Sequence, residues 1–149
     1  MPRFYFISFL YIALTGVITA QTGYKDVDAE KYTKINTFKN TADTQTKIYY
    51  KDTAICKIQC EFIGSTFSST TIYYIRDGKL SQCVYVSLRN HHYYYEEHLY
   101  FTNDKLVKWL NSDKQAGVPG SVPFTNKEKL ALHFFEVELN EVKVKKASR

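Results

Sequence analysis

Hydrophobic and polar residues alternate from about residue 47 to residue 110, with the period of two that is typical of half-buried β-strands. The clearest run is 54–63, where Ala, Cys, Ile, Cys and Phe alternate with mostly polar residues. Asp77-Gly78 is a strong tight-turn signal between two such runs. Turns this short favour neighbouring antiparallel strands, so the pattern predicts a meander. The predicted strands cover residues 46–51, 54–63, 70–76, 79–88, 92–102 and 105–110.

A short sequence motif occurs three times along these strands, at intervals of about 25 residues. Its copies begin at Thr46, Thr70 and Glu97. Each copy is a β-rich run that ends on two aromatic residues, followed by a polar turn and a second apolar run. This is the pattern of a β-hairpin. The repetition therefore indicates one hairpin unit that is used three times, and it specifies architecture rather than chemistry.

A helix is predicted over 125–143, after a linker at 111–124 that contains glycine and proline. Thr125 followed by Glu128 is a capping box, which marks a helix start. A broad apolar stripe follows it, formed by Leu130, Ala131, Phe134, Phe135, Val137, Leu139 and Val142. Residues 135–145 also alternate, so a hairpin remains an alternative reading. A sheet with one apolar face needs a cover, and this helix is the obvious candidate.

A short helix is also predicted near the N-terminus, where Tyr32, Ile35 and Phe38 recur at helical spacing after the potential cap residues Asp26 and Asp28. The expected fold class is therefore α+β. It consists of an antiparallel meander of about six strands, a C-terminal helix packed on one face and a short N-terminal helix.

The first twenty residues are typical of a secretory signal peptide. Arg3 precedes an apolar run at 4–14, and small residues at 19–20 offer a cleavage site before Gln21. A membrane anchor is the alternative, although the apolar segment is short for a span. The sequence thus predicts a secreted or periplasmic protein with a single domain at 21–149, which has the length to bury one core.

The formal net charge of +5 is mild for 149 residues, and the basic residues are dispersed except near the C-terminus. A nucleic-acid-binding protein usually shows a basic stripe with interleaved aromatics. The composition therefore argues against nucleic acid as a partner.

The run Tyr73-Tyr74-Ile-Arg-Asp-Gly-Lys-Leu80 has a related copy that starts at Tyr100, with Asn103 and Asp104 in its turn. Together they resemble uncharacterised exported bacterial proteins built from tandem Tyr-Tyr/Phe-x-x-(Asn/Asp)-Gly-Lys-Leu hairpins. There is a more distant likeness to MORN-type repeats. The first copy departs from the pattern, because Asp-Thr-Ala replaces the Gly-Lys turn. The resemblance implies an envelope or secreted protein of unassigned role, and it lends no catalytic residues.

Three cysteines in an exported chain invite a disulfide. Cys56 and Cys60 are about 13 Å apart along one strand, which is too far for a bridge. Cys83 lies two strands away, and its neighbours indicate the opposite face. The preferred interpretation is that Cys56 and Cys60 are core residues without a disulfide. Bridges from Cys83 to Cys60, to Cys56 or to another chain remain alternatives.

The densest polar cluster spans residues 91–98, where His92, Glu96 and His98 are expected on one strand face. Imidazole and carboxylate suit zinc. The two histidines, however, would be about 20 Å apart along a strand. We therefore expect a solvated strand face with no metal or other cofactor, and a metal site is only a weak alternative.

The tyrosines are the better functional lead. The repeat places Tyr49, Tyr73 and Tyr100 at equivalent positions on the face away from the predicted core, with Lys47 and Lys51 beside the first. Exposed aromatics with polar neighbours suit protein contacts or stacking against sugars. Cross-strand stabilisation of the sheet is the simpler interpretation of the same row.

Nothing in the sequence combines a nucleophile, a base and an orienting group, so we expect no enzyme activity. The leading expectation is a non-enzymatic exported or envelope protein that binds a partner protein through its sheet surface. The alternative is a binder of a small ligand or glycan, which would use the tyrosine row.

Overall fold

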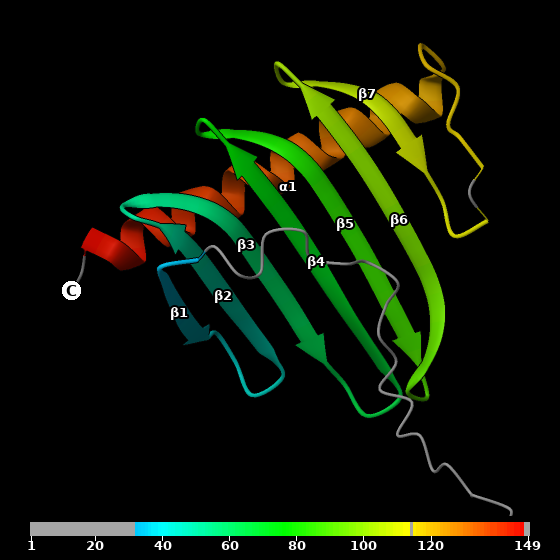
Figure 1. Ribbon diagram of the computed structural model, residues 1–149. Helices are drawn as coiled ribbons and strands as arrows, with labels where there is room; N and C mark the ends of the chain where they lie inside the picture. The colour runs from blue at the N-terminus through cyan, green and yellow to red at the C-terminus, as the bar shows by residue number, and fades with distance from the viewer. Residues whose placement is uncertain (1–31, 114, 148–149) are drawn as a thin grey trace, which may run out of the picture.

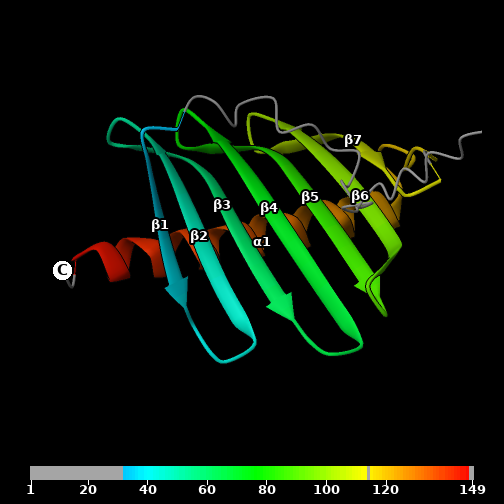
Figure 2. The ribbon, with the colours of Figure 1, turned by 60° about the horizontal axis from the view of Figure 1, so that its bottom comes forward.

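A computed structural model describes residues 32–113 and 115–147, which form one antiparallel sheet and one long helix (Figure 1). The seven strands follow one another in chain order across the sheet, and the helix crosses one of its faces (Figure 2). The predicted meander with a C-terminal helix is thereby confirmed. The elements are β1 (Lys34–Lys39), β2 (Thr44–Lys51), β3 (Ala54–Ile63), β4 (Phe67–Arg76), β5 (Lys79–Arg89), β6 (His92–Thr102), β7 (Lys105–Leu110) and α1 (Val122–Ala147).

The sheet has one strand more than predicted. This additional strand is β1, and it replaces part of the predicted N-terminal helix. Ile35 pairs with Tyr49 and Phe38 with Thr46, so Ile35 and Phe38 lie on opposite faces of the sheet instead of on one helical stripe. The β-branched residues of this segment suit an edge strand better than a helix. The potential caps Asp26 and Asp28 and the predicted signal peptide lie outside the described residues.

The tight turns share a backbone conformation that the alternation of hydrophobic and polar residues does not reveal. In the hairpins at Asp52, Asp77 and Asn103, the first turn residue has a positive φ, between 50° and 55°. A one-residue bulge interrupts the register of each of these hairpins close to its turn. The extra residues are Cys56, Ser81 and Val107. A bulge shifts the phase of the alternation, so residues before and after it exchange faces.

This shift corrects the prediction for β5. Cys83 was expected on the face opposite the core residues Cys56 and Cys60. Because Ser81 is the extra residue, Leu80 and Cys83 both point into the core beneath α1. Val84 lies on the other face of the sheet, which we call the open face.

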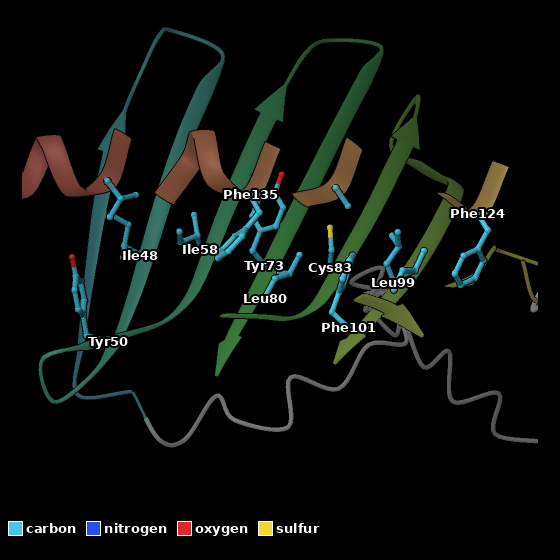
Figure 3. Close-up of a cluster of buried hydrophobic side chains, with 13 residues drawn as sticks. Ile48, Tyr50, Ile58, Tyr73, Leu80, Cys83, Leu99, Phe101, Phe124 and Phe135 are labelled. Atoms are coloured by element: carbon cyan, nitrogen blue, oxygen red, sulfur yellow. The ribbon is translucent and has the colours of Figure 1, made fainter. Parts of the chain in front are cut away.

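The core lies between the sheet and α1. Ile48, Ile58, Tyr73, Cys83 and Leu99 form one register row across five strands, and each is at most 5% exposed (Figure 3). The helix contributes Phe124, Ala131, Phe135 and Val142 to the same cluster. Burial of this row on one face fixes the register of the whole meander.

The helix begins at Val122, earlier than the predicted capping box. Ser121 is the cap, because its Oγ accepts a hydrogen bond from the Phe124 amide at 3.4 Å. Glu128 does not complete a capping box. Its carboxylate instead accepts the amide of Leu106 in β7 at 2.7 Å, which ties the helix to the edge of the sheet. This helix lacks an apolar stretch that is long enough to cross a membrane.

The helix carries a second apolar stripe that does not enter the core. Leu130, Phe134, Val137 and Val144 are between 41% and 66% exposed. They recur at helical spacing, so the broad stripe predicted from the sequence is divided between core and surface. Its exposed half borders the candidate site described below.

Candidate functional site: a groove between the helix and the sheet

The predicted tyrosine row is divided between the two faces of the sheet. Tyr49 and Tyr100 lie on the open face, as predicted. Tyr73 does not: it is 5% exposed and packs against Phe135 of α1, with ring centroids 5.8 Å apart. Tyr74 takes its place, because the second repeat has one more residue between its aromatic pair and its turn. Counting back three residues from each turn, rather than matching the aromatic pairs, would have identified Tyr74.

The corrected row is largely occupied by contacts within the protein. It runs across six strands as Tyr49, Lys57, Tyr74, Gln82, Tyr100 and Lys108. The Lys57 ammonium lies 4.4 Å from the ring centroid of Tyr49 and 5.6 Å from that of Tyr74, and Lys57 is only 4% exposed. Such cation–π contacts stabilise the sheet itself. A binding role for Tyr49 and Tyr100 stays a prediction.

The two lysines predicted beside the row differ in their surroundings. Lys47 lies on the open face and donates a hydrogen bond to Glu61 at 2.9 Å, whereas Lys51 is exposed next to the β2–β3 turn. Burial alone would raise the pKa of Glu61. Hydrogen bonds from Lys47, Gln45 and Gln59 outweigh it and hold this pKa below its ordinary value.

The polar cluster on β6 is separated by another bulge. Glu96 and His98 contact each other on the open face. His92 pairs with Arg89 on the side of the helix, because Tyr94 is an extra residue that reverses the alternation. The three side chains therefore do not share a face as predicted. Among the residues that the structure describes, no three His, Cys, Asp or Glu side chains gather closely enough to hold a metal ion.

A groove runs along α1 on the helix side of the sheet, and sequence reasoning did not find it. Two open cavities, of about 540 and 440 Å³, meet at Cys60, Thr71 and Glu138. The floor of the groove is a single register row across five strands, formed by Thr46, Cys60, Thr71, Tyr85 and Glu97. The wall is a helical stripe of α1, formed by Lys127, Leu130, Phe134, Glu138, Glu141 and Lys145.

A buried ionic cluster closes the apolar end of this groove. The Glu97 side chain is 7% exposed and lies 3.0 Å from the Lys127 ammonium. The same carboxylate accepts a hydrogen bond from Trp109 Nε1 at 2.8 Å and one from the Tyr95 hydroxyl at 3.2 Å. Burial, and then the Glu97 charge, raise the pKa of Tyr95 to about 12. These contacts fix Glu97 and Lys127 in place at the end of the groove.

The cysteines occupy positions that differ from the prediction. Cys60 and Cys83 both face α1, but Tyr73 of β4 lies between their strands, and two strand spacings are about 9.6 Å. That separation does not fit a Cys60–Cys83 disulfide, and both thiols are free in the structure. Cys56 is a bulge residue that lines a small cavity with Tyr74, so it is not a core residue as was expected.

Burial suppresses the reactivity of the two cysteines in the groove. It raises the pKa of Cys60, to which a hydrogen bond with Glu138 adds. Burial, reinforced by the Glu97 charge, raises the pKa of Cys83 to about 12. The reactive thiolate form of Cys83 is therefore scarcer than that of an ordinary cysteine.

This arrangement predicts the order of thiol labelling. At pH 8, a small maleimide should modify Cys56 first and Cys60 more slowly, and Cys83 should react only after unfolding in denaturant. Peptide mass spectrometry at timed intervals measures the order. Cys56→Ser should abolish the fast phase. Rapid labelling of Cys83 in that variant would contradict the burial described here.

Neither the pattern of the sequence nor its motifs pointed to Glu97, Lys127 or Glu138. The sequence marked Glu97 only as the first residue of the third repeat copy. The signal that could have found Glu97 is the position of the bulges near the turns. Once the bulges are placed, Glu97 falls on the core side of β6, where a carboxylate needs partners. Comparison with known proteins adds no assignment, since no family model, curated protein or solved structure matches the chain.

Proposed function

We propose that this protein acts by binding, and that it holds an extended segment of a partner protein in the groove between α1 and the sheet. The observation that carries the proposal is the shape of the groove. Its floor crosses five strands, or about 19 Å at a strand spacing of 4.8 Å, which matches about six residues of extended chain. Both of its cavities are open to solvent, whereas small-molecule sites usually enclose most of their ligand.

The lining of the groove changes along its length. Leu130, Phe134 and Leu99 make one end apolar, and Glu138, Glu141 and Lys145 make the other end charged. A partner segment that fits this lining has one or two large apolar side chains near Phe134, followed by polar residues that carry both donors and acceptors. The protonated thiols of Cys60 and Cys83 support binding rather than nucleophilic chemistry.

Capture of partner proteins from an extract of the native host tests this proposal. The tagged wild-type chain is compared with Leu130→Ala/Phe134→Ala, which removes the apolar wall of the groove. The matched control is Lys129→Ala/Asn140→Ala, two exposed positions on the same helix that do not line the groove. We expect a captured protein that the control retains and the groove variant loses by at least tenfold. Equal capture by all three chains would overturn the proposal.

A further inference from the structure

The groove contains a carboxylate that no lysine or arginine of the described residues neutralises. Glu138 is half-buried on α1 and lines both cavities at the point where they meet. The Cys60 thiol donates a hydrogen bond to it, which supplies polarity but no positive charge. The other carboxylates of the groove are each paired with a lysine, namely Glu61 with Lys47, Glu97 with Lys127, and Glu141 with Lys145.

The surroundings of Glu138 increase its demand for a cation. Glu141 lies three residues further along the helix, and like charges at this spacing repel each other. Phe134 and Val142, one turn away on either side, are apolar. Among the described residues that line the two cavities, four are glutamates and three are lysines.

The groove is therefore locally acidic, although the whole chain has a formal net charge of +5. An excess of negative charge in a binding site complements a positive charge on the partner. The position of that charge is defined, because Glu138 is the groove carboxylate for which the described residues supply no cation.

Glu138 also continues the apolar wall of the groove at a regular interval. Leu130, Phe134 and Glu138 are four residues apart, so successive members lie about 6 Å apart along α1. The helix crosses the strands, and the wall thus follows the length of the groove (Figure 1). In an extended segment, alternate side chains point to the same side and lie about 6.8 Å apart. Every second residue of a bound segment therefore meets one turn of the wall.

We propose that the segment held in the groove carries two apolar side chains and one basic side chain at alternate positions, and that Glu138 binds the basic one. This specificity rests on the proposed function above and narrows the class of partner that the groove accepts. The pattern is apolar-x-apolar-x-basic, where x is any residue, or its reverse if the segment runs in the other direction. Leu130 and Phe134 contact the apolar side chains.

The chemistry of the contact makes Glu138 the residue that determines specificity. A carboxylate forms charge-assisted hydrogen bonds with an ammonium or guanidinium group, and these are stronger than hydrogen bonds between neutral groups. A partner with a neutral side chain at this position leaves Glu138 without a cation and close to Glu141. A partner with an acidic side chain adds repulsion, which excludes it.

Selection from a library of random linear peptides tests this pattern without knowledge of the native partner. The immobilised wild-type chain should enrich peptides that carry the apolar-x-apolar-x-basic pattern in one direction. Glu138→Gln should retain the two apolar positions and lose the preference for lysine or arginine. Glu138→Lys should replace that preference with one for aspartate or glutamate.

Titration of a selected peptide measures the same contact as an affinity. Fluorescence anisotropy compares this peptide with a version in which glutamine replaces its basic residue. Glu138→Gln should weaken binding of the basic peptide about tenfold and leave binding of the glutamine peptide unchanged. The matched control is Glu136→Gln, which removes an exposed carboxylate of the same helix that does not line the groove. It should leave both affinities within about twofold of the wild type.

The outcomes separate this inference from the proposed function. Enriched peptides that share the apolar pair but no basic residue would overturn the inference and leave the proposed function standing. An equal loss of affinity in Glu136→Gln would also overturn it, because the preference would then come from the overall charge of α1. If the wild-type chain enriches nothing, or nothing that Leu130→Ala/Phe134→Ala loses, the proposed function fails and this inference fails with it.

Discussion

Replacing Phe135 with alanine should lower the free energy of unfolding by about 4 kcal/mol, the usual cost of truncating a fully packed phenylalanine. Phe135 is 5% exposed, and its ring lies 5.8 Å from that of Tyr73 at the centre of the core. Truncation leaves a cavity between α1 and β4 that rigid strands cannot close. Urea unfolding followed by circular dichroism measures the change.

The adjacent residue supplies the control. Phe134 is 51% exposed and lines the groove instead of the core, so Phe134→Ala should cost less than about 1 kcal/mol. The two substitutions remove the same atoms from neighbouring positions. Equal destabilisation by both, or a larger effect at Phe134, would mean that α1 presents a different face to the sheet.

The second large effect concerns the ionic cluster at the end of the groove. Glu97→Ala should destabilise the protein by about 3 kcal/mol, because it leaves the Lys127 ammonium and Trp109 Nε1 without their shared acceptor. We place the value at the low end for a broken buried pair, since the Lys127 side chain is 28% exposed and regains some water. Glu97→Gln keeps one oxygen acceptor and should cost about half as much.

An exposed ion pair of similar length provides the comparison. Lys79 and Asp104 lie 2.8 Å apart, but their side chains are 54% and 50% exposed. Lys79→Ala should therefore cost less than about 1 kcal/mol. If thermal or chemical unfolding shows the same small loss of stability for Glu97→Ala, the cluster contributes less to the free energy of unfolding than its burial implies.

The strand pattern predicted the meander because alternation, tight turns and apolar content all agreed between residues 46 and 110. Asp77 and Gly78 illustrate this agreement, since both adopt the positive φ that a two-residue hairpin turn requires. The helix was also predictable, although Ser121 rather than Thr125 is its cap. Local chemistry specified these elements without reference to distant contacts.

The positions of individual side chains were less predictable, and the bulges are the physical reason. A bulge at Ser81 places Cys83 in the core, and a bulge at Tyr94 moves His92 away from Glu96. No residue type marks a bulge strongly, because the extra position is filled here by cysteine, serine, valine or tyrosine. The repeat did contain the information that places Tyr74 on the open face. Tyr74 lies three residues before its turn, as Tyr49 and Tyr100 do.

The groove could not be predicted from the sequence, because it depends on where α1 lies over the sheet. The apolar stripe of the helix predicted burial of both Phe134 and Phe135. Only the packed structure shows that the helix buries one and leaves the other beside a floor that contains Cys60 and Glu97.

Site-specific photo-crosslinking in the native host tests the central claim most directly. A photoreactive amino acid is placed at Phe134 in the groove and, in a separate chain, at Tyr100 on the open face. We expect a discrete crosslinked partner from Phe134 alone, with the attachment mapped by mass spectrometry to a linear segment of that protein. Crosslinks from Tyr100 and none from Phe134 would contradict this account and would return the binding site to the tyrosine row.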